Sequence, residues 1–280
     1  MRVERGKVIS SGKGPGNVLV LISNDDGIDS TGLHALVAAI KGVAEVVVVA
    51  PNRNWSAGGH QRTFDRPLRI ADVTLPDGTA AHACDGSPAD CVAVALLGFL
   101  PRRPDLVVSG INRGANLGDD LIMSGTVAAA MAGVIAGVPG VAVSCAGDWN
   151  AAHWDFTAAA RFAAALVADI ARTGLAPDVL LNVNVPELPS EAITGVAVTR
   201  VGRRIYADAL VERTDPAGRR YYWIGGEAPG GHAEPGTDIA AIADGQISVT
   251  PIHLDMTAHA LLAEVGTRDW PAIVSATRGA

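Results

Sequence analysis

Residues 18–27 read VLVLISNDDG, an apolar run that ends abruptly at Asn24, Asp25, Asp26 and Gly27. A continuous Val/Leu/Ile run of this kind is typical of a strand that is covered on both faces, as in a parallel sheet. The polar residues then lie at the carboxyl edge of the sheet, where open α/β sheets bind ligands. Two adjacent carboxylates repel each other there, so we expect a cationic partner, with a hard divalent ion as the first candidate.

The composition indicates a large aliphatic core and limits the classes of partner. Of the 280 residues 49% are hydrophobic but only 4% are aromatic, which favours a core of Ala, Val and Leu. The formal net charge of -7 gives no overall attraction for a nucleic-acid polymer or an anionic membrane. The three cysteines form no CxxC pair, which fits a reducing compartment. No apolar segment is long enough to span a membrane, so we expect a cytoplasmic protein.

Helix and strand patterns alternate after the first strand and predict an α/β fold, a Rossmann-like and mostly parallel sheet in a three-layer sandwich. Further buried strands are predicted at 45–50, 105–109, 140–144 and 179–185. Helices are predicted at 28–40, 88–100, 127–136 and 151–173. A short hairpin is expected from segments 66–73 and 79–84, around the turn Pro76-Asp77-Gly78.

The chain divides into three predicted parts. Residues 1–16 are polar and rich in Gly and Ser, which predicts a mobile tail, and residues 17–190 are predicted to form the Rossmann-like α/β body. Residues 191–280 change to strands and turns, with a long hairpin around residues 215–218, then a strand at 246–253 and a helix at 257–265. Such a hairpin cannot bury both its faces alone, so we expect the extension to join subunits in a homodimer or homotetramer.

Four oxygen-bearing side chains follow the ends of three predicted strands: Asp25, Asp26, Ser56 and Asn112. Oxygen ligands select Mg²⁺, Mn²⁺ or Ca²⁺ and disfavour zinc. As an alternative, Asp25 caps the following helix while Ser56 and Asn112 satisfy loop amides. The joint occurrence of all four at one sheet edge favours a metal site.

The segment Ser124-Gly125-Thr126 begins an Ala- and Gly-rich helix, whose N-terminus is a natural anion site, although an ordinary N-cap is the simpler alternative. Trp55, next to Ser56, offers a ring on which a base could stack. The chain has no G-x-S-x-G elbow, no Walker A sequence and no G-x-G-x-x-G after its first strand. These absences disfavour a serine hydrolase, a P-loop ATPase and a Rossmann dehydrogenase.

Several blocks together resemble the SurE family of survival proteins, and the similarity covers almost everything from Val18 to Ala258. The blocks are LISNDDGID, VVVVAPNRNWSAGG, DGSPADCVAVAL, PDLVVSGINRGANLGDDLIMSGTVAAA, LNVNVP, DPAGRRYYWIGG and SVTPIHLDMTA. The chain departs from the usual family pattern at Gly59, Gln61, Ser87 and Met123.

The resemblance implies a metal-dependent phosphatase acting on nucleoside 5′-monophosphates, often also on 3′-monophosphates, with exopolyphosphatase activity in some members. It implies one divalent ion per subunit, Mg²⁺ or Mn²⁺ with Ca²⁺ possible in crystals, and a C-terminal extension exchanged between subunits. The implied metal ligands are Asp25, Asp26, Ser56 and Asn112, and the implied phosphate contacts are Asn54, Ser124, Gly125 and Thr126.

We therefore expect a phosphomonoesterase in which Asp25 and Asp26 are the catalytic carboxylates, and in which Asp26 is the better candidate to orient or deprotonate water. Two alternatives stay open at this point. One is an exopolyphosphatase or other small-molecule phosphatase using the same site, and the other is a non-catalytic nucleotide-binding protein. An assay of phosphate release across substrates and metals distinguishes them.

Overall fold

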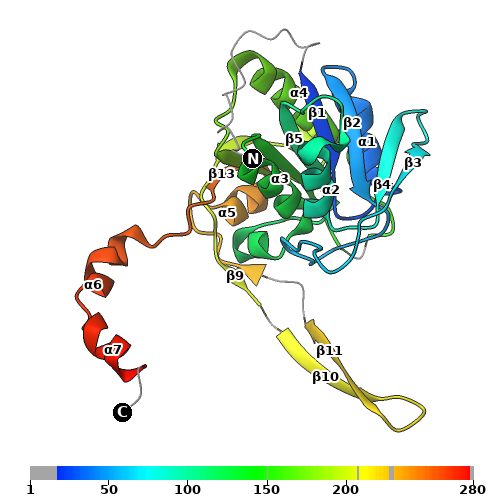
Figure 1. Ribbon diagram of the computed structural model, residues 1–280. Helices are drawn as coiled ribbons and strands as arrows, with labels where there is room; N and C mark the ends of the chain where they lie inside the picture. Colours follow the sequence, from blue (N-terminus) through cyan, green and yellow to red (C-terminus); the bar gives the residue numbers. More distant parts are fainter. Residues whose placement is uncertain (1–17, 150, 207, 227–229, 278–280) are drawn as a thin grey trace.

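The computed structural model describes residues 18–149, 151–206, 208–226 and 230–277; the tail expected at residues 1–16 lies outside them. Its centre is a nine-stranded sheet in the order β3-β4-β2-β1-β5-β6-β7-β13-β8 (Figure 1). The six strands from β4 to β7 in this order run parallel, whereas β3 and β13 are antiparallel to their neighbours β4 and β7. The predicted α/β fold with a mostly parallel sheet is confirmed.

The strands of the central sheet are β1 (Leu19–Ser23), β2 (Glu45–Pro51), β3 (Ile70–Thr74), β4 (Ala80–Cys84), β5 (Leu106–Arg113), β6 (Gly140–Ala146), β7 (Val179–Pro186), β8 (Gly195–Val198) and β13 (Gln246–His253). Two small sheets pair β10 (Asp208–Thr214) with β11 (Arg220–Gly226) and β9 (Arg204–Ile205) with β12 (Gly230–Gly231). The helices are α1 (Thr31–Ile40), α2 (Pro88–Val94), α3 (Gly125–Ile135), α4 (Thr157–Thr173), α5 (Asp238–Ala243), α6 (Leu262–Gly266) and α7 (Trp270–Ala276). Short turns of helix are η2 (Ala95–Phe99), η3 (Gly118–Ile122), η4 (Ser190–Ala192) and η5 (His259–Leu261).

The side chains of β1 show why its sequence is continuously apolar. Val20 and Ile22 pack in the cluster that includes the apolar residues of α1 and α4. Leu21, on the opposite face, packs in the cluster with the apolar residues of α2 and α3. Because helices cover both faces of the sheet, every residue of β1 is buried and the strand needs no polar face.

Several elements have other bounds than the sequence predicts. The strand expected at 66–73 is β3, at Ile70–Thr74, and the helix expected at 88–100 ends at Val94 and is followed by η2. Helix α1 begins at Thr31 instead of residue 28, because Gly27 has a positive φ of 100° and Ser30 caps the helix through the Leu33 amide. Helix α4 begins at Thr157 instead of residue 151, so residues 151–156 form a loop. Strand β5 continues past residue 109 to Arg113, with a register shift on the way.

The C-terminal part contributes both to the sheet and to a projection. Strands β8 and β13 pair within the central sheet, which therefore extends past residue 190. The predicted hairpin is present as β10 and β11 and extends away from the sheet, as do α6 and α7 (Figure 1). The helix expected at residues 257–265 is divided into η5 and α6. No helix of the described residues is long and apolar enough to cross a bilayer.

Candidate active site

The site lies where the strand order reverses. Strand β1 lies between β2, which follows it in the chain, and β5, which comes later. The connections after β1 and β5 therefore lead to opposite sides and leave a crevice at the carboxyl ends of the two strands. Asp25 and Asp26 follow β1, while Asn112 and Arg113 end β5, so the fold brings these two segments together.

A bulge in β5 positions Asn112. Strand β5 advances three residues from Ser109 to Asn112, while β6 advances two from Ala142 to Ser144. An extra residue of this kind redirects the side chains beyond it. The Nδ2 atom of Asn112 donates to the Gly114 carbonyl at 2.9 Å, which leaves the Oδ1 atom for a cation. Asn112 was expected in a loop and instead belongs to the strand.

Asp25 is a buried carboxylate, with 3% of its surface exposed. The Thr126 hydroxyl donates to its Oδ1 atom. The pKa of Asp25 is raised to about 6. Burial is the largest cause and raises the pKa, the hydrogen bond from Thr126 lowers it, and the charge of Asp26 raises it. A Cβ atom on Gly125 would lie 2.9 Å from Asp25 Oδ2, so only glycine leaves this carboxylate its present space.

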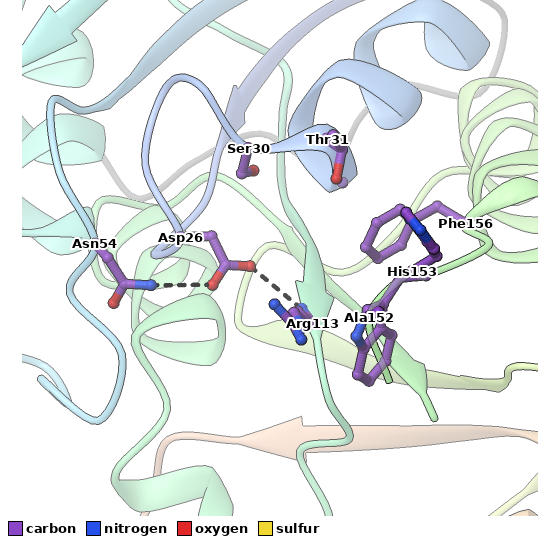
Figure 2. A pocket seen from close by; sticks show the side chains of 10 residues that line it. Asp26, Ser30, Thr31, Asn54, Arg113, Ala152, His153 and Phe156 are labelled. Carbon is purple, nitrogen blue, oxygen red and sulfur yellow. Dashed lines mark hydrogen bonds between the residues drawn. The ribbon is translucent and has the colours of Figure 1, made fainter. Parts of the chain in front are cut away.

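Asp26 is held from two sides (Figure 2). Its Oδ2 atom accepts from the Arg113 backbone amide at 3.2 Å, and its Oδ1 atom accepts from Asn54 Nδ2 at 3.4 Å. Burial raises the pKa of Asp26, while the amide and the charge of Arg113 lower it. The predicted contact residue Asn54 thus reaches the predicted catalytic carboxylate.

The loop after β2, which contains Ser56, is bonded to the backbone of Asp25. The Trp55 amide donates to the Asp25 carbonyl at 2.7 Å, and the Ser56 amide donates to Asn54 Oδ1 at 2.7 Å. Ser56 is exposed and directly follows the residue that bonds Asp25. The Arg53 guanidinium carbon lies 4.4 Å from the centre of the Trp55 ring, which covers one face of the ring predicted to stack on a base.

Buried polar groups fix the loops around these residues. Asp90, at the start of α2, accepts from the Thr63 hydroxyl at 2.7 Å and from the Thr63 amide at 3.1 Å, which anchors the far end of the Ser56 loop. Asn116 donates from its side chain to Ser144 and from its amide to Asn184, both at 2.8 Å. Neither Asp90 nor Asn116 was predicted from the sequence to support the site.

The three residues of the predicted anion-binding segment, Ser124, Gly125 and Thr126, have different roles. Ser124 is the N-cap of α3 and accepts from the Val127 amide at 3.1 Å, which leaves its hydroxyl proton available. Thr126 uses its hydroxyl proton on Asp25. Gly125 lies against the Asp25 carboxylate. A phosphate bound here would therefore meet the Ser124 hydroxyl and the backbone amides of the helix start.

A cavity of about 440 Å³ lies beside Asp26 (Figure 2). It is lined by Asp26, Ser30, Thr31, Gly32, Asn54, Arg113, Ala152, His153, Trp154 and Phe156. Neither Asp25 nor Trp55 belongs to this lining. The wall at residues 152–156 was missed because the Ala-rich segment 151–173 was predicted to be one continuous helix.

The donor set fits a hard divalent cation. Asp25 and Asp26 are adjacent carboxylates that burial makes costly to ionise without a positive charge nearby. Asn112 adds an amide oxygen and Ser56 a hydroxyl, which are ligands of the same hard type. Among the described residues no three His, Cys, Asp or Glu side chains form a metal cluster, so such an ion would depend on the neutral oxygens as well.

Comparisons with known proteins identify the family of this chain. The family model described as "Survival protein SurE" matches residues 20–208. Two proteins named 5′-nucleotidase SurE are similar to this chain. The protein of Chloroflexus aggregans is 54% identical, and the match covers 90% of this chain and 99% of that protein. The protein of Herpetosiphon aurantiacus is 51% identical, and the match covers 90% of this chain and 98% of that protein. The crystal structure of the SurE protein from Aquifex aeolicus superposes with a TM-score of 0.76 at 42% identity, covering 88% of this chain and 98% of the other. The chain therefore belongs to the SurE family.

Proposed function

We propose that this protein is a divalent-metal-dependent phosphomonoesterase that hydrolyses nucleoside 5′-monophosphates to nucleoside and phosphate. The observation that carries the proposal is the convergence of Asp25, Asp26 and the Asn112 amide at the switch point of the sheet, where burial raises the pKa of both carboxyl groups. The similar proteins named 5′-nucleotidase support the substrate class.

Asp25, Asp26, Ser56 and Asn112 would hold the cation. When bound, a divalent ion supplies positive charge that stabilises the transition state of phosphoryl transfer and acidifies water. Thr126 holds the Asp25 carboxylate in place by a hydrogen bond, and Gly125 leaves the space that this carboxylate occupies. The protein thus presents a preorganised anionic site, which costs little reorganisation when the cation binds.

The remaining side chains orient the phosphate and receive the proton. The start of α3 and the Nδ2 atom of Asn54 offer donors to phosphate oxygens. Asp26 lines the cavity and Asp25 does not, so Asp26 is the carboxylate that an incoming water meets. We assign Asp26 to orient this water and to accept its proton at a carboxylate oxygen.

The test is a matrix of metals against substrates. Phosphate release is measured after EDTA treatment and re-addition of Mg²⁺, Mn²⁺ or Ca²⁺, with nucleoside 5′- and 3′-monophosphates and polyphosphate as substrates. We expect metal-stimulated release from 5′-monophosphates, and loss of this activity in Asp26→Asn but not in Asp29→Asn, an exposed residue of the same loop. Phosphate release from polyphosphate alone would contradict the assignment. The absence of phosphate release from every substrate with every metal would also contradict it.

We also propose that the β10–β11 hairpin is a contact between identical subunits. Leu210 and Ile224 are cross-strand partners and both are exposed in the single chain. An exposed apolar pair on a projecting hairpin is typical of an interface. Sedimentation velocity should show a dimer or tetramer for the parent protein and smaller species for Leu210→Glu with Ile224→Glu; an unchanged assembly would contradict this role.

A further inference from the structure

The 440 Å³ cavity has two chemically different ends. At one end lie Asp26 and Asn54, which belong to the proposed reaction centre. At the other end lie His153 and Phe156, from the loop before α4 (Figure 2). Trp154, between them in the sequence, also lines the cavity. The rings of Trp154 and Phe156 are stacked, with centroids 6.2 Å apart and an angle of 17° between their planes.

Arg113 connects the two ends and holds the loop in place. Its backbone amide donates to Asp26, while its Nη2 atom donates to the Ala151 carbonyl at 3.0 Å and to the Trp149 carbonyl at 3.4 Å. Its guanidinium carbon also lies 5.4 Å from the centre of the Trp154 ring. The aromatic wall is therefore fixed at a set position relative to the carboxylate.

A second set of contacts holds the same loop from behind. The Asp155 amide donates to Glu187 Oε1 at 2.8 Å, and the Thr157 amide donates to Asp155 Oδ1 at 2.8 Å. Gly114 lies so close to the Trp149 ring that a Cβ atom there would approach it to 2.5 Å. The loop is thus built into the site by contacts with the ends of β5 and β7.

The lining favours an uncharged aromatic ligand over a chain of phosphates. Of the described lining residues, Arg113 alone carries a permanent positive charge, and its guanidinium is already bonded to the loop. A polyphosphate chain would need several cations along its path. A nucleoside instead needs a flat apolar surface for the base and a few polar groups for the sugar. The volume also lies within the range of about 300–1,000 Å³ of small-molecule sites.

We propose that this cavity binds the nucleoside part of the substrate, with the base against the wall formed by His153, Trp154 and Phe156 and the phosphate toward Asp26. This assignment depends on the proposed nucleotidase function, because it names the part of the substrate that the same site recognises. It makes His153, Trp154 and Phe156 the determinant of preference for nucleotides over simpler phosphate esters, and not Trp55, which does not line the cavity.

The experiment compares two substrates that share only the phosphate. We measure kcat/KM for a nucleoside 5′-monophosphate and for methyl phosphate, and take their ratio. His153→Ala and Trp154→Ala should lower this ratio by about tenfold or more, since stacking on the wall is lost. Trp154→Phe should restore most of the ratio. His82→Ala, on strand β4 and outside the cavity lining, is the matched control and should keep the parent ratio.

Nucleoside binding without turnover separates this inference from the proposed function. Isothermal titration with adenosine, guanosine and uridine should detect binding to the parent and weaker binding to His153→Ala and Trp154→Ala. If the parent hydrolyses nucleotides but the variants keep both the parent ratio and the parent nucleoside affinity, the cavity assignment is wrong. If the parent releases no phosphate from any substrate, the proposed function fails, while weaker nucleoside binding by the variants still supports the cavity.

Discussion

Replacing Asp25 with asparagine should stabilise the metal-free protein while it removes the proposed activity. Burial raises the pKa of Asp25 from 3.8 to about 6. This difference corresponds to about 3 kcal/mol, which is the cost of ionising the carboxyl in the folded protein. Asparagine carries no charge and keeps an oxygen for the Thr126 hydroxyl. The free energy of unfolding of Asp25→Asn should therefore exceed that of the parent by up to about 3 kcal/mol at pH 8.

The dependence on pH has a definite sign. Because the pKa of Asp25 is higher in the folded state, the folded protein binds the proton more tightly than the unfolded chain. Stability of the parent relative to Asp25→Asn is then highest below about pH 4, falls as the pH rises to about 6, and stays low above it. The gap between the two proteins should open over this same window.

Urea denaturation in EDTA, repeated between pH 4 and 8, measures the gap. A saturating divalent ion, at one hundred times its Kd, should stabilise the parent by about 2.7 kcal/mol and Asp25→Asn much less. Asp29→Asn, in the same loop but exposed, should follow the parent throughout. An Asp25→Asn protein that is less stable than the parent at pH 8 in EDTA, or a gap that is equal at pH 4 and 8, would refute the reasoning.

Three further substitutions test the support of the site. Gly125→Ala places a Cβ atom 2.7 Å from Asp25 Cβ, so we expect kcat to fall roughly tenfold or more in initial-rate assays. Gly42→Ala is the control, because a Cβ atom there meets no close neighbour. A Gly125→Ala protein with the parent rate would contradict the close fit between Gly125 and Asp25. Asn116→Ala leaves buried partners unsatisfied and should lower the free energy of unfolding by about 2 kcal/mol in urea titrations, and no loss would remove it as an anchor. Asp90→Ala removes the bonds that hold Thr63, at the far end of the loop that contains Ser56. The metal concentration that gives half-maximal activity should therefore rise, while kcat at saturating metal changes less. An unchanged metal requirement would show that Asp90 does not support the metal site.

Much of the fold could be predicted because its signals are local. The continuous apolar run at residues 18–22 predicts a strand buried on both faces, and Leu21 and Ile22 indeed pack on opposite helical layers. The helix predicted from residue 88 indeed begins at Pro88, where the structure has a capping box between Ser87 and Asp90. These patterns depend on neighbours within a few residues, so the sequence contains them directly.

Errors occurred where tertiary contacts override local preference. Residues 151–156 were predicted as the start of the helix at 151–173, but Arg113 and Glu187 bond their backbone and keep them as a loop. Asn112 was expected after a strand, but pairing of β5 with β6 continues through the bulge to Arg113. Both outcomes depend on partners more than thirty residues away, which no local pattern reports.

The sequence by itself determined the class of sheet and the residue types at its carboxyl edge, because burial pattern and oxygen chemistry are properties of short segments. Only the tertiary structure decided that β1 and β5 are neighbours, that Thr126 and Gly125 confine Asp25, and that an aromatic wall lies across a cavity from Asp26. The physical reason is that strand order and loop position follow from packing between distant segments. The acidic pair after β1 was visible in the chain, but its surroundings exist only in the fold.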